Sequence, residues 1–503
     1  VTLTSIYESI SKYMGNTVTP LALIYIGFLI YETGMKNLKP DAGIWVVSGM
    51  RFIISPLIML LMCRVFNIGG MAQSVFMIEA AMPVMTQSVV VSAYAGADEM
   101  RSKYAVKPHI KPVYDMLTLL LRPYLRLKYR FRVPKDIPAL PDGPIVLLGS
   151  HTGNLDFLFA LATLRQKRFH AVVAAHFYRN RRIAWLLNLF RCIKKEQFRA
   201  DVESIARMKN TIEMGESLLI YPEGEVNGTG RTAPFSDSIA KLAKLLKAPL
   251  YAVRTHGGYF TRPKWNPVQR RGKVETEFEL IATAEEVKSL SMNELYERIE
   301  QKLFVDDYAW QKRRMIPFGG KNRAKGLENL LYLCPKCGGE LTTRTDGNDI
   351  YCAACGNRGT VDEYGFLHPV GEGSVIPEMV PDWVELERDA LRREIAKDDF
   401  ALSAPCHIQY HLDPNTTAHT DVGRGTATLT HTELIYEGTA EGKPIRYAFP
   451  LEGIYKFPFN MGNQFDVPNT IRTISIRPEN KQINEKFVLA LPLIHEYINN
   501  KNA

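Results

Sequence analysis

A histidine and an aspartate separated by four residues, His151 and Asp156, are the side chains of this sequence best suited to acid–base chemistry. A carboxylate that folds back onto an imidazole can hold one ring nitrogen and leave the other free to accept a proton. Such a pair also arises by chance, when the aspartate caps a helix and the histidine is unrelated to it. The pair by itself leaves both interpretations open.

The flanking stretches indicate how a fold would position this pair. An apolar run at 145–149, preceded by Pro144, predicts a buried strand, and residues 157–164 are compatible with a helix. His151 would then follow the carboxyl end of a strand, and Asp156 would lie in the first turn of a helix. Ligands of open α/β sheets bind at that edge, so the pair is a candidate catalytic site.

A second motif lies further along the chain. Residues 218–221 form another short apolar run, which is followed directly by Pro222-Glu223-Gly224. Together with His151 and Asp156, this stretch resembles the glycerolipid acyltransferase family of the 1-acylglycerol-3-phosphate type. Members of that family carry an H-x4-D motif and a later aromatic-Pro-Glu-Gly motif. The resemblance extends over residues 105–285.

The resemblance implies an activity in phospholipid biosynthesis and assigns roles to residues. His151 would be the catalytic base that takes a proton from an acceptor hydroxyl, and Asp156 would orient its ring. The hydroxyl of a lysophospholipid or related glycerolipid would attack the thioester of acyl-CoA or acyl-carrier protein, without a covalent enzyme intermediate. Glu223 and Gly224 would shape the acceptor site.

Three motifs depart from the family pattern. Where the second motif usually has an arginine, the matching cation is Lys195, which lacks the bidentate geometry of a guanidinium. The third motif continues with Glu225-Val226 instead of Thr-Arg, and Arg231 is the nearest cation. The fourth motif keeps Pro249 but has Ala252 at its second proline. We predict that Lys195 and Arg231 bind substrate, and an acceptor other than lysophosphatidic acid stays open.

Short apolar runs alternate with helical patterns from residue 129 to about residue 280. This alternation predicts an α/β sandwich with a largely parallel central sheet. The expected helices include 201–213 and 236–247, and the expected strands are 129–133, 145–149, 170–175, 217–221, 249–255 and 274–281.

Four of the seven cysteines form two Cys-x-x-Cys pairs, each followed by glycine: Cys334, Cys337, Cys352 and Cys355. Two such tight turns can direct four thiolates at one tetrahedral ion, so we predict a structural zinc ribbon. With four cysteine ligands, no coordination position is left open for catalysis. Redox-active or accidental pairs are the alternatives. The pattern also favours a reducing compartment.

The first hundred residues contain three apolar stretches, at 18–31, 43–66 and 71–95. The second and third are long enough to cross a bilayer, which takes about 20 residues. Basic residues, among them Lys36, Lys39 and Arg101, follow the first and third stretches. The positive-inside rule then puts the N-terminus outside and everything after residue 100 in the cytoplasm. We expect a cell-membrane protein with cytoplasmic catalytic and zinc domains.

The N-terminal region also resembles a family of its own. Thr19-Pro20-Leu21-Ala22-Leu23 and the stretch 83–98, which interrupts the third span with Pro83, resemble the C-terminal part of auxin-efflux-carrier transporters. The sequence begins with Val1, so we expect a fragment or a processed product. Either it is the tail of a longer fusion, or two reading frames are joined, with Met100 as a start. Both stay open.

The net charge of +9 is concentrated between residues 101 and 135, where ten basic residues accompany one acid, Asp115. Apolar residues recur at helical spacing from Val113 to Tyr124, with Pro112 at the helix start and Pro123 expected to kink or end the helix. This pattern predicts an interfacial helix on an anionic bilayer. A core-facing helix is the alternative. Nucleic acid is not expected, because no binding motif accompanies the charge.

The chain is too long for one ordinary domain. Its C-terminal part should be β-rich and loosely resembles a pleckstrin-homology-like module, with strands at 426–430, 433–437, 445–449, 470–476 and 487–491 and a closing helix at 492–500. The predicted divisions are a transmembrane segment at 1–100, the acyltransferase-like α/β domain at 101–285, a helical linker at 286–330, the zinc ribbon at 331–370, a second linker at 371–405 and the β-rich domain at 406–503.

These features favour a membrane-associated acyltransferase that uses a lysolipid acceptor. One alternative is a fragment of a membrane transporter with a cytoplasmic regulatory tail. Another is a zinc-ribbon and PH-like binding protein whose acyltransferase fold is inactive. Retention of His151, Asp156 and Glu223 argues against an inactive fold.

Overall fold

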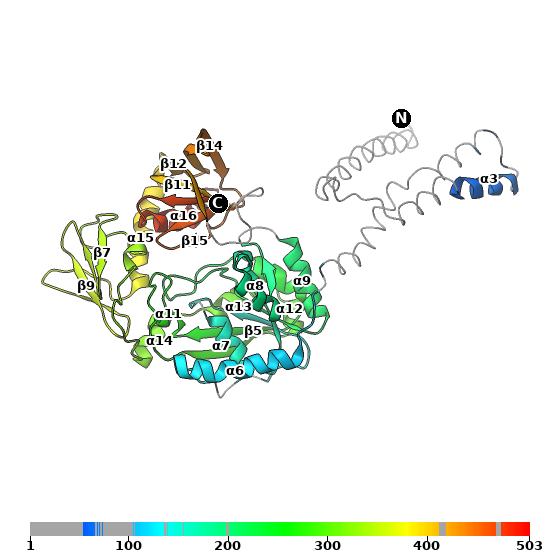
Figure 1. The fold of residues 1–503 in the computed structure, drawn as a ribbon, viewed down its shortest axis with the longest axis horizontal. Helices are drawn as coiled ribbons and strands as arrows, with labels where there is room; N and C mark the ends of the chain where they lie inside the picture. Colours follow the sequence, from blue (N-terminus) through cyan, green and yellow to red (C-terminus); the bar gives the residue numbers. More distant parts are fainter. Residues whose placement is uncertain are drawn as a thin grey trace. The chain divides into compact units, whose positions relative to one another are not determined.

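The computed structural model describes residues 54–65, 68, 70, 73, 104, 106–134, 137, 139–153, 155–197, 201–411, 419–468 and 474–502. The chain divides into two units, 1–103 and 104–503 (Figure 1). Helix α3 (Ser55–Val65) lies within the second predicted span, and most of the three predicted spans fall outside the described residues. No helix in the described part of the chain is long and apolar enough to cross a membrane.

The second unit contains a six-stranded sheet in the order β3-β2-β4-β1-β5-β6. Neighbouring strands are parallel except at the edge, where β6 pairs with β5 in the antiparallel direction. The strands are β1 (Val146–Gly149), β2 (Phe169–Ala174), β3 (Ile193–Lys195), β4 (Ser217–Ile220), β5 (Leu250–His256) and β6 (Glu275–Ala282). Five of the six predicted strands are present, close to their expected bounds.

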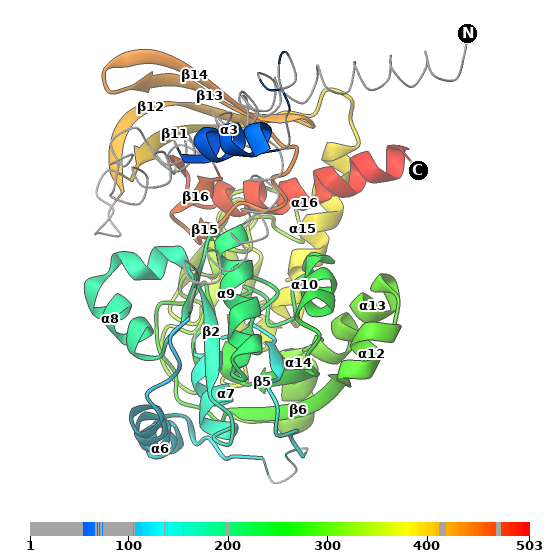
Figure 2. The ribbon, with the colours of Figure 1, turned by 90° about the vertical axis from the view of Figure 1, so that its right-hand side faces the viewer.

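Helices cover both faces of this sheet, because alternate residues of a strand point to opposite sides. Val146 and Leu148 pack with residues of the helices on one face, whereas Ile145 and Leu147 pack with residues of the helices on the other. The first face carries α9 (Val202–Glu213), α10 (Ser238–Leu246), α12 (Ala284–Ser289) and α13 (Met292–Leu303), and the second carries α6 (Lys111–Tyr129) and α7 (Asp156–Thr163) (Figure 2).

The expected strand at 129–133 is wrong. Tyr129 ends α6, and Phe131 packs its ring against Phe159 in irregular backbone. The segment after β6 forms two helices, because Thr283 and Ser291 each begin a capping box. Helix α6 begins with Pro112 in its first turn, as expected, but it continues through Pro123 to Tyr129.

The segment after α13 is packed into the fold. Helix α14 (Asp307–Arg314) buries Tyr308 and Trp310, and Phe318 is fully buried a few residues later. These side chains belong to one large hydrophobic core that also includes residues of the four-cysteine segment and of the C-terminal sheet. The region predicted as a helical linker is therefore part of the core that joins its neighbours.

A small antiparallel sheet of four strands carries the cysteines, in the order β10-β9-β8-β7. Its strands are β7 (Thr343–Asp346), β8 (Asp349–Cys352), β9 (Arg358–Val361) and β10 (Leu367–Pro369). Helix α15 (Val380–Ile395) follows and contacts α16 (Ile483–Asn502).

The C-terminal part is a seven-stranded antiparallel sheet in the order β14-β13-β12-β11-β17-β16-β15. The predicted strand at 487–491 is wrong, because these residues lie inside α16. The strands are β11 (Leu402–Tyr410), β12 (Thr420–Leu429), β13 (Glu433–Ala440), β14 (Lys443–Pro450), β15 (Phe459–Asn460), β16 (Gln464–Val467) and β17 (Ile474–Pro478). Figure 2 shows α15 and α16 beside this sheet.

Candidate active site

His151 and Asp156 meet at the carboxyl end of β1, as their spacing predicted. The sheet strand ends at Gly149, and the chain then turns into α7, which begins at Asp156. Nδ1 of His151 lies 3.4 Å from Oδ2 of Asp156. The same carboxylate oxygen accepts a 2.8 Å hydrogen bond from the main-chain N–H of Gly153. Asp156 thus fixes both the loop and the ring.

The carboxylate of Asp156 is buried, whereas the imidazole of His151 keeps 19% of its side-chain surface exposed. Burial raises the pKa of Asp156, and its interaction with His151 opposes that change. A methyl group at Gly153 or Gly258 would stand 3.0 Å from Oδ1 of Asp156. Both positions must therefore stay small for the carboxylate to occupy this place.

Glu223 supports the same loop from β4. Its Oε1 accepts a 2.6 Å hydrogen bond from the main-chain N–H of His151, and its Oε2 accepts 2.8 Å from the main-chain N–H of Ala233. The side chain of Asn227 also donates to Oε2, at 3.3 Å. Burial raises the pKa of Glu223, and these donors oppose the change. Glu223 therefore holds the backbone of the loop that carries His151.

A tyrosine ring lies beneath the imidazole. The rings of His151 and Tyr221 are 4.6 Å apart between centroids, with a 36° angle between their planes. A side chain at Gly149 would overlap the Tyr221 ring. The glycine that ends β1 therefore allows the aromatic residue of the second motif to pack against the first motif.

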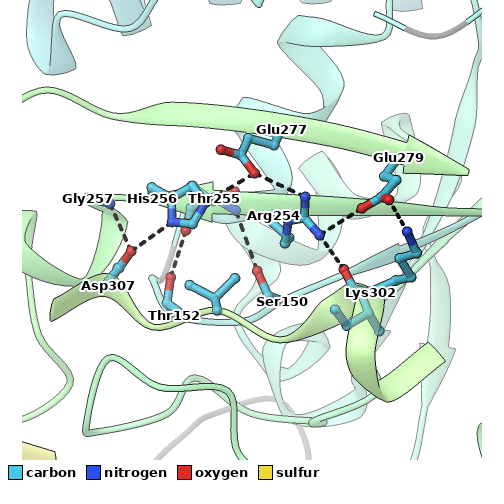
Figure 3. Close-up of polar contacts among 12 residues, drawn as sticks. Ser150, Thr152, Arg254, Thr255, His256, Gly257, Glu277, Glu279, Lys302 and Asp307 are labelled. Carbon is cyan, nitrogen blue, oxygen red and sulfur yellow. Dashed lines mark hydrogen bonds and ion pairs between the residues drawn. The ribbon is translucent and has the colours of Figure 1, made fainter. Parts of the chain in front are cut away.

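A second histidine–aspartate pair at the same sheet edge was not predicted. His256 ends β5, the strand beside β1, and its Nδ1 lies 3.3 Å from Oδ1 of Asp307 (Figure 3). Burial lowers the pKa of His256, but bonds to Asp307 and Glu277 outweigh burial and raise it to about 9. The sequence offered one signal for this pair, a histidine at the end of a predicted strand. It gave no sign of the partner, because Asp307 lies 51 residues further along the chain.

The two histidine pairs are joined through the backbone. Thr152 donates a 3.2 Å hydrogen bond to the carbonyl oxygen of Thr255, and the main-chain N–H of Thr255 donates 3.5 Å to Ser150 (Figure 3). Gly257 donates its main-chain N–H to Asp307 at 3.2 Å. These contacts hold the loop that carries His151 against the end of β5.

A cavity of about 220 Å³ lies beside Asp156. Two cations, Lys128 and Arg262, and two aromatic residues of α6 stand on its wall. The lining residues are Tyr124, Lys128, Tyr129, Gly153, Leu155, Asp156, Phe159, Gly258, Thr261, Arg262 and Gln269. The cavity therefore combines positive charge with apolar surface next to the dyad.

The family comparison agrees with this geometry. Residues 128–256 match the family model described as Acyltransferase. This matching segment, residues 128–256, is similar to that family and is named the acyltransferase-family domain. Residues 1–105 match a second family model, described as Membrane transport protein.

One solved structure similar to this chain is the 1-acyl-sn-glycerophosphate (LPA) acyltransferase, PlsC, from Thermotoga maritima. It is 13% identical, with a TM-score of 0.34, and the match covers 53% of this chain and 98% of that chain. A search of curated proteins found no match.

The three further residues predicted to bind substrate or shape its site each lie in a different environment. Lys195 ends β3 and is half-buried, and burial lowers its pKa. Gly224 adopts a positive φ of 74° and accepts a 2.6 Å hydrogen bond from the side chain of Gln197. Arg231 bonds Asp306 at 2.8 Å and Asp382 at 3.0 Å. The binding roles of these residues stay predictions.

Glu225, which stands where the third family motif usually has a threonine, forms ion pairs within the fold. Glu225 keeps 11% of its side-chain surface exposed and lies 2.8 Å from Nζ of Lys264, and Lys456 forms a second ion pair with it. Burial raises the pKa of Glu225, but the two lysines outweigh burial and lower it. Glu225 therefore ties the acyltransferase-family domain to the C-terminal part and does not present a free negative charge to a substrate.

The four predicted metal ligands converge. The sulfur atoms of Cys334 and Cys355 are 3.7 Å apart, and those of Cys337 and Cys352 are 3.8 Å apart. All four ligand atoms lie within 4.8 Å of one another. A tetrahedron of thiolates bonded at about 2.3 Å has edges of about 3.8 Å, so the sulfur positions fit a metal ion. Gly338 and Gly356 follow the pairs with φ of 70° and 74°.

Proposed function

We propose that this protein is a membrane-associated acyltransferase. It moves a fatty acyl group from acyl-CoA or acyl-carrier protein to the hydroxyl of a lysophospholipid or related glycerolipid. The observation that carries the proposal is the 3.4 Å approach of His151 Nδ1 to the buried Asp156, inside an acyltransferase-family domain. This contact holds the ring so that Nε2 can face a substrate.

In this mechanism, Nε2 of His151 takes the proton of the acceptor hydroxyl as its oxygen attacks the thioester carbonyl carbon. The carbon–oxygen bond forms, and the carbonyl electrons move to an oxyanion. When the oxyanion collapses, the carbon–sulfur bond breaks and the thiolate receives the proton from His151. Asp156 stabilises the transient imidazolium. General-base catalysis typically contributes about 10²–10⁴-fold, so the rest of the acceleration comes from positioning and oxyanion stabilisation.

The cavity beside Asp156 is the proposed place for the acceptor. Lys128 and Arg262 would attract an anionic headgroup, and the apolar residues would contact the glycerol backbone or acyl chain. Lys195 and Arg231 are proposed to bind substrate, and Gly224 to shape the acceptor site. Arg231 could contact a substrate only when one of its two ion pairs opens. Glu223 shapes this site through its hold on the loop.

The four cysteines are proposed to hold structural zinc. Their thiolates fill all four positions, so the ion would stabilise the small sheet and leave no position for substrate. The ion would also reduce the repulsion among the thiolates. The two Cys-x-x-Cys pairs of the sequence favour a reducing, cytoplasmic environment for this part of the chain.

Helix α6 supports association with a bilayer. It buries Tyr114, Thr118, Leu125 and Tyr129 against the domain, whereas Met116, Leu120, Tyr124 and Leu127 remain exposed beside basic residues. This exposed stripe favours the interfacial role over the core-facing alternative. The match of residues 1–105 to a membrane transport model supports a membrane-inserted N-terminal part. Both observations support a proposed active site at the surface of the cell membrane, and the positive-inside pattern of the sequence favours its cytoplasmic face.

The transport-family match also supports a second candidate function, a transporter fragment with a regulatory tail. The two candidates differ in a direct assay. The protein would be incubated with radiolabelled acyl-CoA or acyl-carrier protein and a panel of lysolipids, and the products would be identified. A labelled diacyl product supports the acyltransferase. Absence of any acylated product with both donors and all acceptors would contradict it.

A further inference from the structure

A second group of metal-ligating side chains lies in the unit formed by residues 104–503, apart from the His151–Asp156 pair and the cysteines. Nδ1 of His109 is 2.6 Å from Oε2 of Glu216, and Nε2 of His170 contacts the same oxygen. The two imidazole rings are 4.1 Å apart between centroids. All three ligand atoms lie within 4.8 Å of one another.

The outer ring nitrogens fix the tautomers. Nε2 of His109 lies 3.1 Å from the carbonyl oxygen of Phe190, and Nδ1 of His170 lies 2.8 Å from that of Arg191. A carbonyl only accepts hydrogen bonds, so each of these nitrogens carries a hydrogen. In a neutral imidazole, the other nitrogen then presents a lone pair, and both lone pairs point at the carboxylate of Glu216. Histidines that ligate metals commonly donate their second N–H to a backbone carbonyl in this way.

Protonation of the two histidines alone does not account well for the close contacts between their ring nitrogens and Glu216. The side chains of His109 and His170 are fully buried, and two imidazolium rings beside one carboxylate would leave an uncompensated positive charge. Neutral lone pairs facing an anionic oxygen repel unless a cation lies between them.

We propose that His109, His170 and Glu216 bind a divalent transition-metal ion of the zinc type. Two imidazoles and one carboxylate are a ligand set that such ions accept, at bond lengths of about 2.0–2.2 Å. A tetrahedral ion with bonds of about 2.1 Å needs ligand atoms about 3.4 Å apart, so each histidine nitrogen would move roughly 1 Å from Oε2 of Glu216 to admit the ion. Glu216 keeps 15% of its side chain exposed, so water can reach the fourth position.

The location indicates a structural ion. His170 lies at the start of β2 and Glu216 directly precedes β4, at the amino ends of the parallel strands. His151 and Glu223 follow the carboxyl ends of β1 and β4, at the opposite edge of the sheet. His109 precedes α6, and its bond to Glu216 spans 107 residues. The ion therefore ties the segment that leads into α6 to the central sheet, independently of the reaction.

Metal content and cobalt spectroscopy test the proposal on the full chain. We expect about two zinc ions per wild-type chain, one in the thiolate site and one in the histidine site. Glu216→Gln and His109→Gln should each bind about one. The exposed Glu203, paired with Arg207, supplies the control, and Glu203→Gln should keep about two. With Co²⁺, the Glu216 and His109 variants should keep the near-ultraviolet thiolate bands, which also report that the cysteine segment is folded.

A wild-type Co²⁺ titration decides the question without any variant. The second equivalent should add visible d–d bands while the thiolate bands stay constant. Saturation at about one equivalent per wild-type chain would overturn the proposal. So would a Glu216→Gln variant that binds as much metal as the wild type.

Discussion

The main-chain N–H of His151 donates a 2.6 Å hydrogen bond to Oε1 of Glu223, which joins the two motifs that sequence places on different strands. The imidazole is thereby positioned from two sides. Asp156 holds the ring, and Glu223 holds the backbone from which the ring projects. The orientation of the base depends on both carboxylates, although only Asp156 touches the ring.

Glu223→Gln should lower both stability and turnover. Every partner of Glu223 is a donor, so the amide NH₂ of glutamine would face another N–H and leave a buried donor unpaired. This costs about 1–3 kcal/mol of unfolding free energy. Denaturant unfolding and steady-state kinetics measure the two effects. Glu203→Gln is the exposed control, and equal behaviour of the two variants would show that Glu223 does not hold the loop.

Asp156→Asn should lower kcat by roughly 10²–10⁴-fold, the range of general-base catalysis. The neutral amide no longer stabilises the imidazolium, whether its oxygen or its NH₂ group replaces Oδ2, the one atom that both Nδ1 of His151 and the N–H of Gly153 contact. Acyl-transfer kinetics with a fixed lysolipid provide the measurement. The exposed pair of His368 and Asp362 offers the control, because Asp362→Asn alters a similar contact away from the site. An unchanged kcat in Asp156→Asn would separate this carboxylate from the reaction.

Stability should fall as the pH rises through about 9. The folded-state pKa of His256 is about 9, above its ordinary value of 6.5, because Asp307 and Glu277 outweigh burial. A raised pKa contributes stability that is fully present below pH 6.5 and is lost as the pH passes 9. The change should be roughly 1–3 kcal/mol, measured by urea unfolding across this range. His256→Gln should flatten the profile, and a wild-type profile that is already flat would contradict the assignment.

Zinc removal should affect more than the cysteine segment. Gly365, just after β9, approaches Phe260 of α11 (Gly258–Thr261) so closely that a side chain there would overlap the phenyl ring. Phe260 and the β-strand residues Ile350 and Val361 share one core. Hydrogen exchange with a chelator should therefore show loss of protection in β7–β10 and also around α11. Protection lost only in the small sheet would show that its core is independent.

The sequence predicted the central sheet well where apolar runs were short and bounded by turn residues, as at 145–149 and 217–221. The prediction of secondary structure failed where an apolar run fitted both the two-residue period of a strand and the 3.6-residue period of a helix. Phe487–Leu491 is apolar throughout, a pattern that fits a strand and a helix equally well. The predicted helix began at Pro492, whereas α16 begins at Ile483 and runs through this proline. Strand β3 has only three residues, too few for a pattern.

For the candidate site too, the sequence predicted contacts between residues that are close along the chain and missed contacts between distant ones. His151 and Asp156, or the paired cysteines, are close in sequence, so their spacing carried the geometry. His256 and Asp307 are 51 residues apart, and His109 lies 107 residues from Glu216. Only the packing of strands and helices brings such residues together, and no local pattern records it. The ion pairing of Glu225 with Lys264 and Lys456 is another contact of this kind.

The most direct test of the central claim is acyl transfer by His151→Ala, compared with wild type and with His368→Ala. His368 is an exposed histidine that also bonds an aspartate, so its variant controls for the loss of an imidazole. The account predicts that wild type and His368→Ala form the labelled product at similar rates, whereas His151→Ala, with an unchanged melting curve, loses at least about 10²-fold in rate. Product formation by His151→Ala at the wild-type rate would contradict it.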